Sequence, residues 1–102
     1  MKVLTEGHKY QLKNYENPNE TQVIQFIEKV PTGENNELKT INDGTTNEEV
    51  LEMLIDRMEH LQNKFPCKEN VIVIKNLEES LMWLNKRTEK RKKREVKGKH
   101  QA

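Results

Sequence analysis

The C-terminal half of the sequence repeats its apolar residues with the period of an α-helix. From residue 50 they recur every three or four positions and therefore share one helix face. The set is Val50, Leu51, Leu54, Ile55, Met58 and Leu61. Thr46 and Glu49 have the spacing of a capping box, which marks a helix start. Pro66 disfavours helix at the preceding residue, so this first helix is expected to end near residues 64–65.

A second apolar stripe predicts a longer helix, from residues 67–70 to about residue 95. Its steps of three and four residues are typical of coiled coils and continue through Thr88 to Arg91. The stripe consists of Ile74, Leu77, Leu81 and Leu84. Other apolar residues widen the surface beyond it: Val71, Ile72, Val73, Met82 and Trp83. We expect this helix to be covered on more than one side.

The N-terminal part is typical of short strands separated by turns. Residues 8–15 and 21–30 flank the turn-forming sequence Glu-Asn-Pro-Asn, and residues 31–36 turn the chain into residues 37–42. Residues 2–5 are a candidate fourth strand. The predicted class is therefore α+β, an N-terminal antiparallel β-meander followed by a C-terminal two-helix hairpin. We expect a single domain of residues 1–102, made of a meander (1–43), a helical hairpin (44–97) and a frayed tail (98–102).

Composition changes this picture by pointing to self-association. The chain has 102 residues, 32% of them hydrophobic and 34% charged. A domain of this size buries only about two-thirds of its unfolded surface, so its own core is limited. We therefore expect part of the apolar surface to be buried between copies of the chain.

The single cysteine, Cys67, allows neither an internal disulfide nor a thiol metal cluster. We find no secretory signal or membrane-spanning run and expect a cytoplasmic protein.

Charge is distributed unevenly around a net value of +1. Residues 86–99 hold nine Lys and Arg against two Glu, which leaves nine basic and fifteen acidic residues elsewhere. A basic end on an acidic body indicates an anionic partner. Cations near a helix C-terminus also complement the helix dipole, so a solvated helix end is an equally valid interpretation of residues 92–99.

The sequence offers no catalytic constellation, and we predict that the protein is not an enzyme and needs no metal or cofactor. His8, His60 and His100 are scattered rather than set at metal-ligand spacing. Gly44 is isolated, which fits a turn before a helix and not a phosphate loop. What remains is binding.

Arg87 and Arg91 stand four residues apart, so both project from one helix face. Their planar guanidinium groups can clamp a phosphate or diphosphate. Alternatively, they are surface arginines paired with Glu89 or Glu95. Asn70, in the first turn of the same helix, can contact a base edge or ribose hydroxyl, or simply cap the helix.

Several separate segments together resemble one protein family. They are Asp43-Gly-Thr-Thr-Asn-Glu-Glu-Val-Leu51, Leu54-Ile-Asp-Arg57, Phe65-Pro-Cys-Lys-Glu-Asn70 and Leu77-Glu-Glu-Ser-Leu-Met-Trp-Leu-Asn-Lys-Arg-Thr88. They resemble the phage Thoeris anti-defence 1 family, whose helical hairpin is shared with anti-CBASS sponge proteins. The basic ending from Arg94 to His100 is also similar.

The resemblance implies a fold of one sheet followed by two helices. It also implies that the protein sequesters, without cleaving it, the glycocyclic ADP-ribose signal that TIR enzymes of Thoeris defence make. It further implies a homo-oligomer, with a dimer as the unit and a hexamer as the assembly, in the cytoplasm of the infected bacterial host. Some relatives hold CBASS cyclic trinucleotides in separate pockets. Ligand contacts carry over to Asn70, Arg87, Arg91 and His60, the last where an adenine-stacking aromatic is expected. Arg57 and Thr88 are candidates for the second pocket.

Helix geometry adds a constraint. Asn70 and Arg87 are 17 residues apart on one predicted helix, or about 25 Å. If both contact one ligand, they must come from different copies. Antiparallel pairing of this helix would allow that and would bury Leu77, Leu81 and Trp83.

Two other functions are weighed against the sponge. The first is a small basic-tailed nucleic-acid-binding protein, whose affinity would fall steeply with salt. Nucleic acid is the less favoured partner, because only Tyr10, Tyr15 and Phe26 could stack on bases from the strands. The second is an assembly protein whose oligomer is its whole function, which would leave the Arg87–Arg91 pair unexplained.

Overall fold

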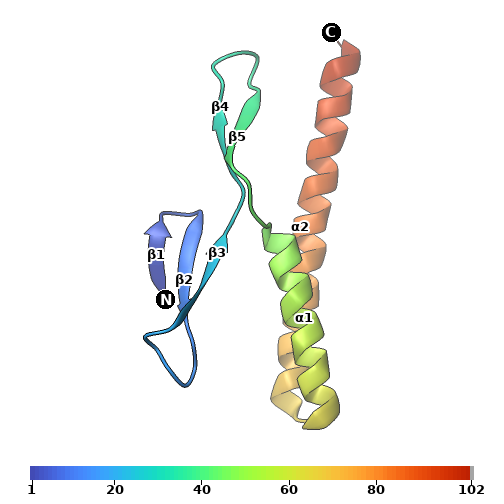
Figure 1. The fold of residues 1–102 in the computed structure, drawn as a ribbon. Coiled ribbons are helices and arrows are strands. Elements are labelled where there is room, and N and C mark those ends of the chain that lie inside the picture. Colours follow the sequence, from blue (N-terminus) through green and yellow to red (C-terminus); the bar gives the residue numbers. More distant parts are fainter. Residues whose placement is uncertain (102) are drawn as a thin grey trace. The chain divides into compact units, whose positions relative to one another are not determined.

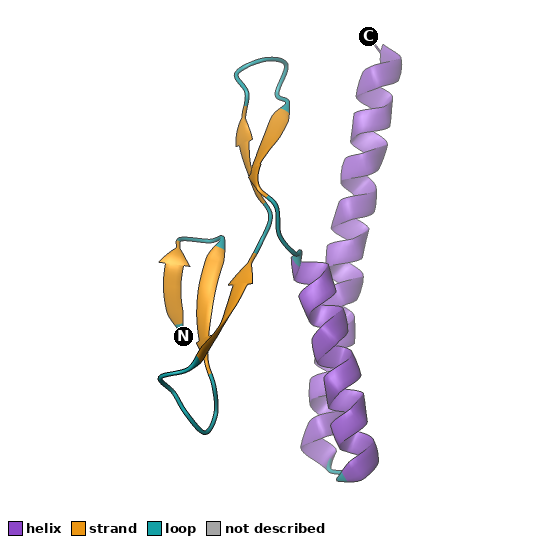
Figure 2. Cartoon of the chain, in the orientation of Figure 1, coloured by secondary structure: helices purple, strands orange, loops and turns teal. Residues whose placement is uncertain are grey.

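Five strands precede two helices in the computed structural model, which describes the backbone of residues 1–101 and the side chains of residues 1–94. Figures 1 and 2 show this order, with all strands in the N-terminal part and both helices after them. The elements are β1 (Lys2–Thr5), β2 (Lys9–Lys13), β3 (Thr21–Gln25), β4 (Glu28–Pro31), β5 (Leu38–Asn42), α1 (Asn47–Lys64) and α2 (Lys68–Gln101). The predicted α+β class is confirmed. The chain forms two compact units, and the first ends at Thr46.

The strands of the first unit form two separate sheets. β1, β2 and β3 make an antiparallel meander, in which Tyr10 lies opposite Ile24. The predicted fourth strand, β1, is present. β4 and β5 pair with each other in a second, two-stranded antiparallel sheet. The prediction of one continuous strand over residues 21–30 is wrong, because this run contributes to both sheets.

The break falls where the backbone changes hydrogen-bonding partners. The Phe26 N–H still donates to the His8 carbonyl, at 2.7 Å. One residue later, the Ile27 N–H donates to the Thr45 carbonyl at 2.9 Å, and the Thr45 N–H returns a bond of 2.9 Å to the Gln25 carbonyl. β-Branched side chains favour an extended backbone, but pairing decides which sheet a strand joins. Here the segment before α1 displaces β2 as the partner.

Gly44 lies at this crossing and has a role that the sequence did not reveal. A β-carbon built on Gly44 would overlap the Gln25 carbonyl oxygen and would lie 2.7 Å from the carbonyl carbon of Phe26. Any side chain at position 44 would therefore push the two segments apart. The glycine permits this close approach. The turn predicted at this position is absent, because residues 43 and 44 adopt neither turn nor bend and Thr45 forms a β-bridge with Phe26.

α1 and α2 pack together as an antiparallel hairpin in the second unit. α1 begins directly after Thr46 and ends at Lys64, as predicted. Apart from Leu54, every member of its predicted apolar stripe is half-buried. The half-buried residues of α2 in turn follow the predicted steps of three and four: Asn70, Ile74, Leu77, Leu81, Leu84 and Thr88.

α2 is longer than expected. It continues to Gln101 instead of ending near residue 95, because Lys, Arg and Glu are good helix formers and one glycine costs only about 1 kcal/mol. Residues 98–101 of the predicted tail are thus helical, and Ala102 lies outside the described residues. The 18 residues of α1 match the length of α2 only to about residue 85, and Figure 1 shows α2 extending past the start of α1.

The chain leaves much apolar surface uncovered. Among the side chains of residues 1–94, none is fully buried. On α2, exposed fractions reach 47% for Ile72, 52% for Met82 and 54% for Trp83. Isolated exposed apolar residues are ordinary, but a domain without one buried side chain has little hydrophobic stabilisation. Within the described residues, no helix combines the length and the apolar character needed to cross a membrane.

Candidate functional site

The predicted site residues fall into two groups at opposite ends of the hairpin. His60 lies in the last part of α1 and Asn70 in the first turn of α2, so both are near the connection between the helices. Arg87 and Arg91 lie on the part of α2 that extends past α1. Because α2 is one continuous helix, Asn70 and Arg87 are about 25 Å apart along its axis. One chain therefore does not bring the two groups together.

Arg87 and Arg91 are both exposed and lie one turn apart. Arg91 also continues the half-buried stripe of α2 by another step of three from Thr88. Arg91 lies past the start of α1, so the stripe at this level has no packing partner within the hairpin. Two guanidinium groups at an open end of a helix can bind a phosphate group with planar, paired donors.

Trp83 belongs to this group, although the sequence pattern indicated it only as part of the apolar surface of α2. It lies one turn before Arg87, so Trp83, Arg87 and Arg91 follow each other at steps of four residues. The Lys86 Nζ lies 5.0 Å from the centroid of the Trp83 ring, a cation–π contact. The spacing of four residues was visible in the sequence and could have identified Trp83 as an aromatic neighbour of the arginine pair.

His60 and Arg57 line one shallow groove on the outer face of α1. The groove has a volume of about 490 Å³ and is lined by Met53, Asp56, Arg57, Glu59, His60 and Asn63. Two carboxylates against one guanidinium make this surface unfavourable for a phosphate by itself. An anion bound beside His60 would need cations from elsewhere, and Arg87 and Arg91 of the same chain lie at the far end of the hairpin.

Thr88 is half-buried on the α1-facing stripe of α2, and its hydroxyl donates a 3.1 Å hydrogen bond to the Leu84 carbonyl of its own helix. Arg57 and Thr88, the candidates for a second pocket, thus lie on different helices and at different levels of the hairpin. The structure does not bring them together in one chain.

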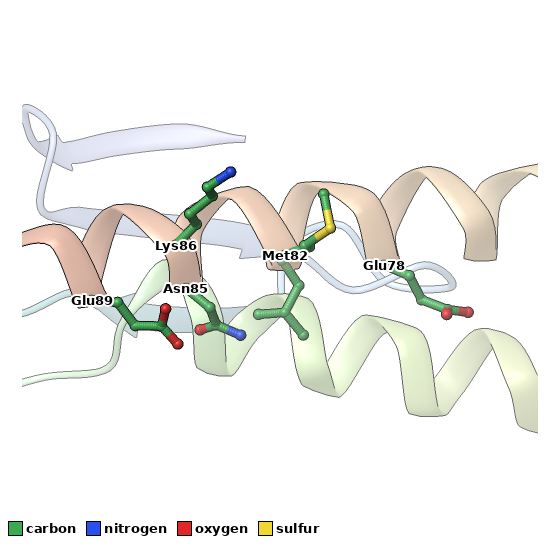
Figure 3. Close-up of a pocket in the computed structure, with 6 residues that line it drawn as sticks. Glu78, Met82, Asn85, Lys86 and Glu89 are labelled. Atoms are coloured by element: carbon green, nitrogen blue, oxygen red, sulfur yellow. The ribbon is translucent and has the colours of Figure 1, made fainter.

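Another groove lies on α2 alone and contains none of the predicted site residues. Its volume is about 590 Å³, and Figure 3 shows Glu78, Met82, Asn85, Lys86 and Glu89 projecting from successive turns of the helix around it. Leu81 completes the lining. A groove formed by a single helix can cover only one side of a ligand, whereas small-molecule sites bury most of the ligand surface. We interpret it as part of the exposed flank of α2.

The structure limits how much of the surface expected to meet a second copy is available. Leu77 and Leu81 were expected there; both are half-buried members of the stripe of α2, which packs with α1, so a second copy would cover only the part of each that stays exposed. Trp83 remains exposed, as that expectation requires. The helical period places the stripe toward the nearest packed helix, which here is α1 of the same chain.

Among the described residues, no three His, Cys, Asp or Glu side chains are grouped so that they could hold a metal ion. Cys67 is exposed in the connection between the helices. Its backbone N–H donates a 3.0 Å hydrogen bond to the Gln62 side chain, which helps to hold the connection in place.

Two comparisons with known proteins bear on this site. Residues 24–89 match the family described as Acb2/Tad1, hairpin domain. The matched range includes His60, Asn70 and Arg87, and it ends two residues before Arg91. The chain is also 48% identical over 60 residues to "Thoeris anti-defense 1" of Bacillus phage SBSphiJ7. That similarity covers 58% of this chain and 42% of the phage protein, so the chain spans less than half of the length of this relative.

Proposed function

The chain belongs to the Acb2/Tad1 hairpin-domain family, and from this premise we propose that it is a phage anti-defence protein that sequesters cyclic nucleotide signals. Its primary ligand is glycocyclic ADP-ribose, the signal of Thoeris TIR enzymes, and CBASS cyclic trinucleotides are the second class. It acts in the cytoplasm of the infected host. The observation that carries the proposal is the exposed Arg87–Arg91 pair, with Trp83 one turn away, on the open end of α2.

These three side chains offer complementary contacts to a nucleotide. The two guanidinium groups bind the diphosphate through charge-assisted hydrogen bonds. Trp83 presents an aromatic face next to them, and its partial exposure leaves area for a base or ribose to cover. The Asn70 side chain has both a donor and an acceptor, which suits the edge of an adenine or a ribose hydroxyl.

The proposed site is completed by a second copy of the chain. Asn70 and His60 of one copy meet Arg87 and Arg91 of the other when two α2 helices pair in antiparallel orientation. The arginines then supply the positive charge that an anion bound beside His60 needs, since Asp56 and Glu59 line the same groove. The lack of a fully buried side chain among residues 1–94 supports such pairing, because association would cover exposed apolar surface. We propose a dimer as the unit, assembled further into a hexamer.

Sequestration needs no bond to be made or broken. The protein removes free signal by mass action, so its effect depends on its concentration relative to the signal and on its affinity. Arg57 and Thr88 are proposed for the separate trinucleotide pocket. Since one chain does not bring them together, that pocket also requires more than one copy.

Calorimetric titration tests the proposal directly. The parent protein is titrated with glycocyclic ADP-ribose and with a cyclic tri-adenylate, and Arg87→Ala serves as the variant. Losing charge-assisted hydrogen bonds should weaken binding of glycocyclic ADP-ribose by about 10- to 150-fold in Arg87→Ala. Lys39→Ala removes one positive charge from an exposed position of β5 and is the matched control. Flat traces for both ligands with the parent protein would refute the sponge proposal.

A second measurement separates sequestration from cleavage. The complex with glycocyclic ADP-ribose is heated to unfold the protein, and the released nucleotide is analysed by mass spectrometry. We expect the ligand to be recovered intact. Recovery of a hydrolysed product that is absent from a heated ligand control would contradict a purely binding function.

A further inference from the structure

The open end of α2 carries more positive charge than the proposed site uses. Residues 86–94 include seven Lys and Arg and one Glu. All of these basic side chains are exposed. Arg87 and Arg91 belong to the site, and Lys86 contacts Trp83. The remaining four, Lys90, Lys92, Lys93 and Arg94, have no assigned role.

These four residues surround the helix rather than forming one face. Successive residues are rotated by about 100°, so Lys90, Lys92 and Lys93 point in different directions. They lie past the start of α1, which therefore cannot pair with them within the hairpin. Glu89 is the only acidic residue of this segment. Such an arrangement creates a positive field in all directions around the helix, and it does not form a surface shaped for one contact.

The field overlaps the proposed site. Lys90, Lys92 and Lys93 are one to six residues from Arg87 and Arg91, which is less than about 10 Å along the axis. At 0.1 M salt the Debye length is also about 10 Å, so these charges are felt at the arginine pair. The rest of the chain is acidic, with nine basic and fifteen acidic residues outside 86–99. Electrostatic attraction of an anion to the chain is therefore concentrated at this end of α2.

We propose that Lys90, Lys92 and Lys93 guide anionic nucleotides to the Arg87–Arg91 site and raise the association rate without contacting the bound ligand. This inference rests on the proposed function, since it assumes a ligand with a diphosphate at that site. Electrostatic guidance of this kind changes the association rate and its salt dependence and leaves the dissociation rate nearly unchanged. For a sponge the rate matters, because it competes with the effector for newly made signal.

The size of the effect follows from Coulomb's law with screening. Three unit charges about 10 Å from a ligand of charge −2, in water, change the association rate by about fivefold at 0.1 M salt. At 0.01 M the Debye length is about 30 Å, and the factor becomes about twentyfold. At 1 M the Debye length is about 3 Å, and the difference is almost lost.

The experiment compares the parent with two triple variants. Lys90→Gln with Lys92→Gln and Lys93→Gln removes the three charges, whereas Lys90→Arg with Lys92→Arg and Lys93→Arg keeps them at the same positions. Calorimetry gives Kd for glycocyclic ADP-ribose at 0.01, 0.1 and 1 M salt. A chase of radiolabelled ligand with unlabelled ligand gives the dissociation rate, and the ratio of the two gives the association rate.

We expect the Gln variant to associate about twentyfold more slowly than the parent at 0.01 M salt and about as fast at 1 M, with the same dissociation rate. The Arg variant should match the parent throughout. Equal association rates for Gln variant and parent at 0.01 M would overturn the inference. So would faster dissociation of the Gln variant, which would show direct contact with the ligand. A parent that binds no glycocyclic ADP-ribose at any salt would instead refute the proposed function itself.

Discussion

The proposal that one binding site is shared between two copies can be tested by mixing variants. Asn70→Asp is nearly isosteric, removes the amide donor and adds a negative charge to a site that holds an anionic ligand. Arg87→Gln with Arg91→Gln removes the two cations at the other end of the hairpin. Each loss involves charged groups and should weaken binding by about 100-fold. Neither variant should bind ligand at concentrations where the parent is saturated.

The separation along α2 determines what a mixture of the two variants will do. Asn70 and Arg87 lie about 25 Å apart on one continuous helix, so a shared site takes Asn70 from one copy and the arginines from another. In a random 1:1 mixture, half of the copies supply an intact Asn70 and half supply intact arginines. About one-quarter of the sites then contain both, and they should have the affinity of the parent. This fraction does not depend on whether two or six copies assemble.

The assay is calorimetric stoichiometry after the two variants are unfolded and refolded together. A control mixture combines the parent with a variant that carries all three substitutions. A shared site predicts about one-quarter of the parent's capacity in both mixtures. A site within one chain predicts no capacity in the first mixture and about one-half in the control. The second pair of results would refute the reasoning from helix length.

Four further predictions concern the fold and the surface. Gly44→Ala should destabilise the protein by about 1–3 kcal/mol in thermal unfolding, because the new β-carbon overlaps the Gln25–Phe26 backbone. Gly33 has a φ of +84° but open space around it, so Gly33→Ala should lower the stability by only about 1 kcal/mol. Equal losses of stability for Gly44→Ala and Gly33→Ala would show that the close approach is not what requires glycine at position 44. Leu81→Ala should lower the free energy of unfolding in urea by about 1–2 kcal/mol, which is less than for a fully buried leucine because Leu81 is half-buried. A larger loss of stability for Met82→Ala, at an exposed position, would contradict the orientation of α2. The emission of Trp83, the single tryptophan, should change when glycocyclic ADP-ribose binds, and calorimetric binding with unchanged emission would place the ligand away from Arg87. A 20-base-pair DNA duplex at 0.15 M salt should fail to displace the nucleotide, whereas displacement with a steep salt dependence would favour the nucleic-acid alternative.

Local periodicity predicted most of the hairpin. The capping box at Thr46 and the proline at 66 located both ends of α1, because these signals act on backbone conformation within one turn. The three-four steps of α2 likewise identified the stripe that is half-buried in the structure. The C-terminal end of α2 was placed too early, since no sharp stop signal precedes Gly98 and one glycine does not end a helix made of good helix formers.

The division of the strands between two sheets could not be predicted from the local sequence pattern. Residues 21–30 have the composition of one strand, and only the tertiary hydrogen bonds of Ile27 and Thr45 divide them between two sheets. The close approach at Gly44 depends on the same crossing. Pairing partners that are distant in sequence leave no periodic signal in either segment, so no reading of one segment could have found the break.

For the candidate site, the sequence alone determined which residues carry positive charge and amide groups and that Asn70 and Arg87 are 17 residues apart. It identified the apolar stripe of α2 but could not decide whether α1 of the same chain or a second copy covers it, because other sides of this helix also hold apolar residues. The tertiary structure decided that Leu77 and Leu81 pack within the hairpin, that Trp83 stays exposed beside Arg87, and that the arginines extend beyond α1. The physical reason is that periodicity fixes the angle at which each side chain projects around the helix axis. The position and length of the neighbouring helix decide which face, and which turns along the axis, are covered.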